Sequence, residues 1–354
     1  MRQTPLYDEH VALGGKVVDF HGWALPVQFS GIVQEHHHTR SKAALFDCSH
    51  MGEFRIRGEA AIKAYSDLVC SDPMKLAVGR GRYGALLHDD GGIIDDIITI
   101  KLAEDDLFVV TNAGPLEKVA GIFCGCHENV VNVSDQTAKI DIQGPLARDI
   151  LAREIPKASE LKYFRACLAE WSGTEIVLSR TGYTGELGYE LFVPESLAVP
   201  LWRALLAHDE VAPAGLGARD TLRTEVGYAL SGQDFDESRS PLEANMETFV
   251  AWDTAFIGKE ALRDQQAKGG YSVLTAIKTA DRRAPRHEFD VKQDGTAVGV
   301  VTSGTFGPSV GHGIGLAYVP QECASPGTRL TAGPKDLAIE TATLPFYTAG
   351  TCRS

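Results

Sequence analysis

Two adjacent aspartates, Asp95 and Asp96, interrupt the otherwise apolar run Ile93–Ile98. Strand side chains alternate between faces, so the two carboxylates are expected to point in opposite directions. Both faces of the run are otherwise apolar, a pattern typical of a strand covered on both sides. At least one acid should therefore lie in a desolvated place, of the kind in which active sites tune acids and bases. Alternatively, both acids lie near a hairpin mouth, where solvent or turn amides satisfy them.

The loop Arg180-Thr181-Gly182-Tyr183-Thr184-Gly185 is the second group of residues that could do chemistry. Its two glycines would let the backbone approach a flat ligand, and the Tyr183 ring offers a stacking surface. Glu190 follows on an expected strand, and a carboxylate accepts two parallel donors well. The pterin edge of a folate presents such a pair of donors. A tight turn followed by a surface glutamate is the simpler alternative.

The segment Gly215-x-Gly217-x-x-Asp220 only weakly resembles a phosphate-binding loop, because it lacks the third glycine and the Lys-Ser/Thr pair. Its glycines are expected to form a tight turn before a helix. On that helix Arg219 and Arg223 share a face, where they could oppose a ligand carboxylate or pair with a nearby acid.

Metal chemistry is not expected. Consecutive helical residues point about 100° apart, so His36-His37-His38 cannot converge on one ion and should form a mostly solvated face. The seven cysteines are scattered, and Cys124-Gly125-Cys126 lacks the spacing of a zinc site. Their odd number in a large chain is typical of reduced cytosolic thiols.

The elements that must position these residues are predicted to be a mixture of helices and strands. Strands are expected at 83–87, 93–100, 107–110 and 189–193, with a turn at 88–92. Helices are expected at 31–45, from Pro145 onward, at 195–207 and at 215–228. Residues 262–272 are interpreted as a boundary, and the glycine-broken runs 273–278, 296–303, 312–319 and 328–333 predict a small β-barrel or sandwich.

Length and charge limit the class of protein. The 354 residues exceed the roughly 250–300 that one core supports, so two or three domains are expected. A net charge of −13 makes nucleic acid a poor partner, although a local group of arginines can still bind a small anion. The sequence has no signal core and no apolar run of about 18 residues, which favours a cytoplasmic protein that does not associate with membranes.

Taken together, the motifs resemble the aminomethyltransferase (T-protein) family of the glycine cleavage system, in order and along nearly the whole chain. The likeness is carried by Thr4-Pro5-Leu6-Tyr7, Val18-Asp19-Phe20-x-Gly22-Trp23, Leu45-Phe46-Asp47-x-Ser49-His50-Met51-Gly52-Glu53, Asp90-Gly91-Gly92-Ile93-Ile94-Asp95-Asp96, Gln143-Gly144-Pro145, Arg180 to Glu190, Gly215 to Arg223, Phe256-Ile257-Gly258-Lys259-Glu260 and Thr302-Ser303-Gly304-Thr305-Phe306.

The resemblance implies an α+β fold of three domains in a cloverleaf-like arrangement, with folate near the centre and a C-terminal β-barrel or sandwich. Residues 1–50 with 140–230 would form a discontinuous folate-binding domain. Residues 51–139 with 231–265 would form a second discontinuous domain, and 272–354 the C-terminal β domain.

The resemblance also implies an activity. The methylene of an aminomethyl group would pass from a lipoylated carrier, the H-protein, to tetrahydrofolate as acceptor substrate, with release of ammonia. Asp96 matches the family's catalytic acid, whose negative charge would favour attack by folate N5 and stabilise an iminium-like cation.

Binding residues follow from the same resemblance. Glu190 matches the pterin-binding carboxylate and Arg219 the ligand-site arginine. The aromatic positions around folate match Tyr83, Tyr183, Tyr228 and, near the C-terminus, Tyr347. Residues 244–252 depart from the commoner Ala-Gly-Leu-x-Trp-type run, and the departure bears on the choice of donor.

Two other functions are therefore weighed. One is a related folate-dependent demethylase of a small methylated donor, which predicts turnover without any carrier. The other is a non-catalytic, folate-binding regulatory or assembly protein. The combination of Asp96 with the Asp90-Gly91-Gly92 turn argues against the non-catalytic alternative.

Overall fold

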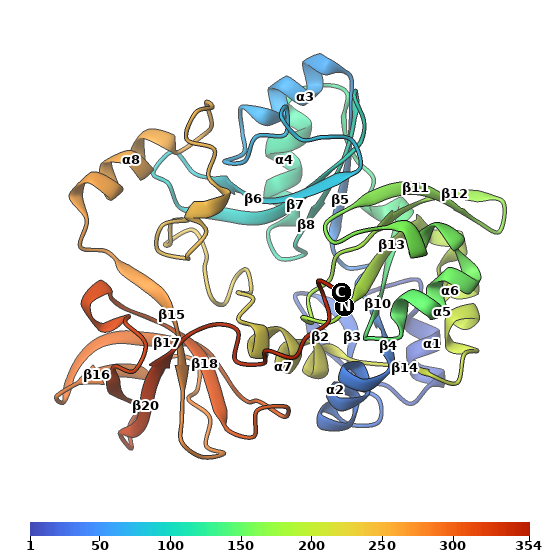
Figure 1. Cartoon of the computed structure of the whole chain (residues 1–354). Helices are drawn as coiled ribbons and strands as arrows, with labels where there is room; N and C mark the ends of the chain where they lie inside the picture. The colour runs from blue at the N-terminus through green and yellow to red at the C-terminus, as the bar shows by residue number, and fades with distance from the viewer.

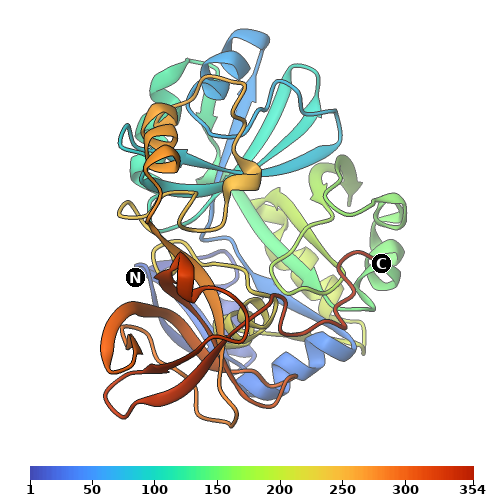
Figure 2. The same ribbon diagram turned by 60° about the vertical axis from the view of Figure 1, so that its left-hand side comes forward.

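Three lobes surround a common centre in the computed structural model, which describes residues 1–354 (Figure 1). The first lobe is built on a six-stranded sheet, the second on a five-stranded sheet, and the third is a closed barrel. The same three bodies are distinct when the molecule is turned (Figure 2). The predicted α+β class with a C-terminal barrel is confirmed.

The first lobe packs helices against a mixed sheet. In spatial order its strands are β11 (Ala166–Trp171), β12 (Thr174–Ser179), β13 (Gly188–Pro194), β10 (Thr137–Gln143), β4 (Ala43–Asp47) and β14 (Val211–Pro213). Helices α5 (Ala147–Glu154) and α6 (Ala198–Leu206) contribute to its core, in which the Trp202 ring is fully buried. Beside it lie α1 (Tyr7–Ala12) and the small sheet β1 (Arg2–Gln3), β3 (Trp23–Gln28) and β2 (Lys16–Phe20).

The second lobe is an antiparallel sheet with two helices on one face. Its strands are β6 (Arg80–Leu87), β7 (Ile93–Ala103), β8 (Asp106–Thr111), β5 (Gly52–Arg57) and β9 (Val130–Asn132). Helices α3 (Glu59–Ser66) and α4 (Leu116–Cys126) cover it, and the Phe123 ring packs edge-on against Phe54 and Tyr65 at 5.3 and 5.1 Å. The strands predicted at 83–87, 93–100 and 107–110 are confirmed as β6, β7 and β8.

Strand β7 is covered on both sides, as its apolar pattern predicts. Ile97 belongs to the core beneath the helices, and Thr99 shares a hydrogen bond with the Tyr65 hydroxyl on that side. Ile98 and Ile100 pack instead toward the first lobe, in a cluster that includes Phe192 of β13. The odd and even positions of β7 therefore face different environments.

The third lobe closes six strands into a barrel. In spatial order these are β15 (Ser272–Lys278), β18 (Gly313–Pro320), β17 (Thr296–Phe306), β16 (Asp290–Gln293), β19 (Arg329–Ala332) and β20 (Leu337–Ala342). The four predicted strands are present, whereas β16 and β20 were not predicted.

The chain between lobes differs from expectation in one place. Residues 262–272 were interpreted as a boundary, but α8 (Lys259–Lys268) occupies most of that range. The helix was not predicted because its apolar face is narrow: only Leu262 is buried, in the same cluster as Ile93 and Phe235. The barrel begins directly after it, at Ser272 of β15.

The helix predicted at 31–45 was also too long. Helix α2 spans Ile32–Ser41. The apolar residues that follow belong to β4, which lies between two other strands of its sheet. The expectation of a solvated histidine face is wrong for His36, which is fully buried, although His37 is exposed. None of the helices is long and apolar enough to span a lipid bilayer.

Candidate active site

A cavity of about 1900 Å³ lies where the three lobes meet. The sequence-predicted site residues that line it are Tyr83, Asp96, Tyr183, Glu190, Arg219 and Tyr228. They come from β6, β7, the loop before β13, β13 itself, and α7 (Leu216–Val226) with its following turn. Residues far apart in sequence, such as Phe20 and Phe249, also line it, as do the barrel residues Leu274 and Leu316.

The aspartate pair meets at one amide. Asp95 is fully buried on the helix-covered side, whereas Asp96 is half-buried and lines the cavity. Just beyond β8, the Asn112 side-chain nitrogen donates to Asp95 Oδ1 at 2.7 Å and to Asp96 Oδ1 at 2.5 Å. The expectation that at least one acid is desolvated is confirmed, and the two faces of the strand are joined through Asn112.

Burial raises the pKa of both acids, and repulsion from the Asp96 carboxylate raises the pKa of Asp95 further. Hydrogen bonds from Tyr83 and Asn112 act in the opposite direction on Asp96. Burial, together with the Asp96 charge, holds the pKa of the Tyr83 hydroxyl well above its usual value. The pair therefore retains a proton to higher pH than isolated carboxyl groups do, next to a phenol that stays protonated.

A second charged group is built on β10 and β13, where Asp141 and Glu190 lie directly opposite each other. Two facing carboxylates would repel, and the fully buried Lys139 lies between them. Its ammonium is 2.8 Å from Asp141 Oδ1 and 2.8 Å from Glu190 Oε1. Burial alone would raise the pKa of Asp141, but Lys139 and Arg219 hold it below its usual value.

Glu190 keeps acceptor capacity toward the cavity. One carboxylate oxygen accepts from Lys139, and the other accepts from the Thr181 hydroxyl. An ionised carboxylate has about four lone-pair positions, so about two remain for a ligand. With an exposed side-chain fraction of 8%, Glu190 presents these positions in a largely dry setting.

An arginine and two tyrosines form the adjoining wall. Arg219 donates to Asp141 Oδ2 at 3.1 Å, and its guanidinium lies 5.0 Å from the centre of the Tyr183 ring. The Tyr183 and Tyr228 rings are stacked, with centroids 5.7 Å apart. The Tyr183 hydroxyl donates to the Ala229 carbonyl at 2.5 Å, which fixes the ring plane.

The glycines of the 180–185 loop serve the protein's own packing. A Cβ on Gly182 would lie 2.0 Å from the Gln143 amide oxygen, and one on Gly185 would lie 2.3 Å from Val226. Gly185 also has a φ of +79°. Protein side chains therefore fill the space that a Cβ would take at both glycines, although Gly182 itself lines the cavity.

Arg223, the second arginine of α7, has a different role from Arg219. It is almost fully buried and donates to Asp234 at 2.6 Å and to the Ser303 hydroxyl at 2.8 Å. Asp234 also accepts from Thr302 of the barrel at 2.5 Å. Arg223 therefore ties the helix to the third lobe.

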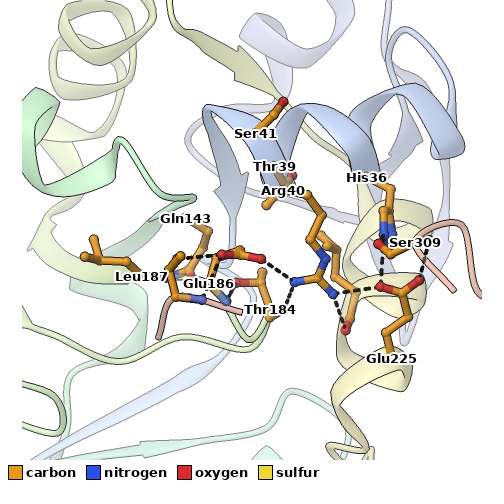
Figure 3. A network of polar contacts seen from close by, with 12 residues as sticks. His36, Thr39, Arg40, Ser41, Gln143, Thr184, Glu186, Leu187, Glu225 and Ser309 are labelled. Atoms are coloured by element: carbon orange, nitrogen blue, oxygen red, sulfur yellow. Dashed lines mark hydrogen bonds and ion pairs between the residues drawn. The ribbon is translucent and has the colours of Figure 1, made fainter. Parts of the chain in front are cut away.

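Tyr347 does not line the cavity. Its ring lies 4.1 Å from the Arg40 guanidinium, which is bound by Glu186 and Glu225 at 2.9 Å each. The same network includes His36, 3.1 Å from Glu225 (Figure 3). Burial lowers the pKa of His36 despite this acid. The network joins α2, α7 and the segment after β20, away from the aspartate pair.

Sequence reasoning missed several residues that line the cavity or lie buried behind its wall. Lys139 and Asp141 alternate with apolar residues along β10, a period-2 signal that places both on one face. Asn112 carried the weaker signal of a polar residue directly after a strand. His50 lines the cavity as a neutral imidazole, because burial lowers its pKa to about 4.

Comparisons with known proteins agree along the whole chain. Residues 6–254 match the GCVT N-terminal domain family, and residues 273–348 match the Glycine cleavage T-protein C-terminal barrel domain family. An aminomethyltransferase of Halothermothrix orenii is 40% identical and covers 98% of this chain and 100% of its own. One of Saccharopolyspora erythraea is 40% identical and covers 98% of each chain. The crystal structure of glycine cleavage system aminomethyltransferase T from Bartonella henselae superposes with a TM-score of 0.93 at 30% identity, over 99% of both chains.

Proposed function

Because this chain belongs to the aminomethyltransferase family, the T-protein family of the glycine cleavage system, we propose that its cavity binds tetrahydrofolate and accepts the aminomethyl group of a lipoylated carrier protein. The observation that carries the proposal is the convergence of Asp96, Glu190 and Arg219 on one cavity. The proposed products are ammonia, the dihydrolipoyl carrier and 5,10-methylenetetrahydrofolate.

The acceptor fits the wall described above. The free lone pairs of Glu190 suit the ring N–H and amino group of a pterin, which donate in parallel. The stacked rings of Tyr183 and Tyr228 suit a flat heterocycle or an aryl group. Arg219 donates one N–H group to Asp141, and its other N–H groups can donate to a ligand acceptor.

Tetrahydrofolate supplies two secondary amines, N5 and N10, which together take the carbon. The S–CH2 and CH2–NH2 bonds break, and two bonds from nitrogen to that carbon form. The two displaced protons leave with the thiol and with ammonia. Asp96, at the cavity face of β7, would hold a proton from these amines and stabilise the positive charge on the carbon as the bonds change.

A demethylase of a small methylated donor is the second candidate function. It is favoured by one observation: Ala244, Asn245, Met246, Thr248 and Phe249, from the segment that departs from the family pattern, line the cavity. The Phe249 ring packs edge-on against Tyr83 at 4.8 Å. This segment therefore lies where it can shape the pocket for the one-carbon donor.

The test mixes purified protein with tetrahydrofolate and aminomethylated lipoyl carrier, and measures methylenetetrahydrofolate and ammonia. Asp96→Asn and a reaction without carrier run beside it. We expect product that requires the carrier and that falls by about 10²-fold or more in Asp96→Asn, the range for loss of a general acid–base group. Turnover of small methylated amines without carrier would instead support the demethylase.

A further inference from the structure

We propose that Asp95 is a positioning residue for the reacting acid Asp96, and that it acts through the side-chain amide of Asn112. The inference rests on the proposed function for the role of Asp96. Asp95 itself does not line the cavity, and its exposed fraction is 0%, so it cannot touch a substrate. Any effect of Asp95 on the reaction must pass through its neighbours.

The hydrogen bonds around Asp95 give it one orientation. Its Oδ2 accepts the Asn112 backbone N–H at 2.8 Å, and its Oδ1 accepts the Asn112 side-chain nitrogen at 2.7 Å. The same Oδ1 accepts the Ser231 hydroxyl at 3.0 Å. A buried carboxylate with three donors is well satisfied, and it accepts without donating when ionised.

These contacts decide which end of the Asn112 amide faces Asp96. The amide nitrogen has two hydrogens, one directed to each aspartate. If the amide turned over, its oxygen would face both acids, and since the pair holds at most one shared proton, at least one of the two bonds would be lost. Asp95 therefore holds the nitrogen in place, and Asp96 receives a donor at 2.5 Å on the oxygen that lies on the cavity side.

Asp95 also joins this donor to the aromatic wall. Ser231 lies two residues after Ala229, whose carbonyl accepts the Tyr183 hydroxyl. The turn that orients Tyr183 is thus bonded to the acid that orients Asn112. The buried Asp95 therefore contributes both to the proton affinity of Asp96 and to the position of the Tyr183 ring.

The charge of Asp95 is the second way in which it acts on Asp96. Repulsion between the adjacent carboxylates favours a proton on the pair. Replacing Asp95 with neutral Asn removes that repulsion, so Asp96 should ionise at lower pH. A residue that merely supported the sheet would leave this ionisation unchanged.

The experiment follows carrier-dependent transfer against pH for Asp95→Asn, Asn112→Ala, Asp96→Asn and the doubles that contain Asp95→Asn. We expect Asp95→Asn to lower kcat about tenfold or more, with the KM for tetrahydrofolate within about twofold, and to move the acid limb of the kcat profile to lower pH. Because Asp95 acts through its partners, adding Asp95→Asn to the Asn112→Ala or Asp96→Asn variant should lower kcat little further.

Thr99→Val is the matched control. It removes a buried hydrogen bond from the same strand, to Tyr65, without touching the pair, and should leave the pH profile in place. The proposal would be overturned if the losses of kcat in Asp95→Asn and Asn112→Ala multiplied in the double variant. It would also be overturned if the acid limb of the kcat profile did not move in Asp95→Asn.

A readout without turnover separates this proposal from the proposed function. Carboxyl ¹³C NMR titration of the parent and of Asn112→Ala should show that Asp96 titrates at higher pH once its donor is removed. If the parent transfers no one-carbon unit, the proposed function fails while this titration still tests the Asp95–Asn112–Asp96 unit. An Asp96 titration that is unchanged in both Asp95→Asn and Asn112→Ala would refute the positioning role.

Discussion

Replacing Glu190 with Gln tests the proposed folate site most directly. Lys139 and the Thr181 hydroxyl both donate to Glu190, so an amide nitrogen cannot face Lys139. It must face Thr181, whose hydroxyl can turn and accept. The side chain then keeps one acceptor oxygen but loses its charge and one acceptor position toward the cavity.

The lost interaction is a hydrogen bond to a charged group, worth about 1.5–3 kcal/mol. Since about 1.4 kcal/mol corresponds to a factor of ten, the dissociation constant for tetrahydrofolate should rise roughly 10- to 150-fold. Anaerobic calorimetric titration measures this constant, and urea unfolding reports whether the variant stays folded.

Glu170→Gln provides the matched control. Glu170 is exposed on β11, in the same sheet, and should bind tetrahydrofolate as the parent does. A folded Glu190→Gln protein with a dissociation constant within about twofold of the parent would refute the assignment of the pterin edge to this carboxylate.

Three further predictions concern stability. Lys139→Met should cost about 3–5 kcal/mol of unfolding free energy, because it leaves buried carboxylates without their cation. Lys63→Met, in an exposed pair, should cost less than about 1 kcal/mol. Urea unfolding compares the two variants, and equal losses would contradict the argument. His50 binds a proton near pH 6.5 in the unfolded state but only near pH 4 in the folded state, so the free energy of unfolding increases as the pH is raised from 4 to 6.5. In His50→Leu this increase should be smaller by about 3 kcal/mol, as measured by unfolding at several pH values. An unchanged pH dependence would show that His50 is not buried in its neutral form. Gly182→Ala should lose about 1–3 kcal/mol through overlap with a glutamine side chain, whereas Gly121→Ala, in an open helical position, should gain about 0.5–1 kcal/mol; thermal midpoints decide, and a stable Gly182→Ala would contradict the packing.

The sequence predicted most elements because local patterns were strong. The apolar run around Asp95 predicted a strand covered on both faces, and the glycine-broken runs after residue 272 predicted a barrel or sandwich, of which the structure shows the barrel. Helix α8 was not predicted because its residues are mostly polar and only one of them, Leu262, is buried. The prediction for His36 failed because burial in its helix comes from lobes packing around it, which no local pattern reports.

The site was predictable only in part, for a physical reason. Residue types and family likeness pointed to Asp96, Glu190 and Arg219, whereas the partners that give them their properties come from distant segments. Lys139 meets Glu190 across a strand pair, and Asn112 meets Asp96 by reaching past the end of β8. Such pairings depend on register and on loop direction, which pattern analysis of one sequence does not fix.

The cavity between three lobes has a consequence for synthesis of the protein. Its lining begins at Val18 and includes Leu316 and Leu344, so nearly the whole chain must leave the ribosome before the pocket closes. The first two lobes can fold earlier, since domains fold as units during translation at about 5–20 residues per second. For those last seconds Asp96, Glu190 and Arg219 would be present but open to bulk water. A truncated translation product would thus carry every polar group of the site and still lack the enclosure that protects a reactive one-carbon unit from hydrolysis.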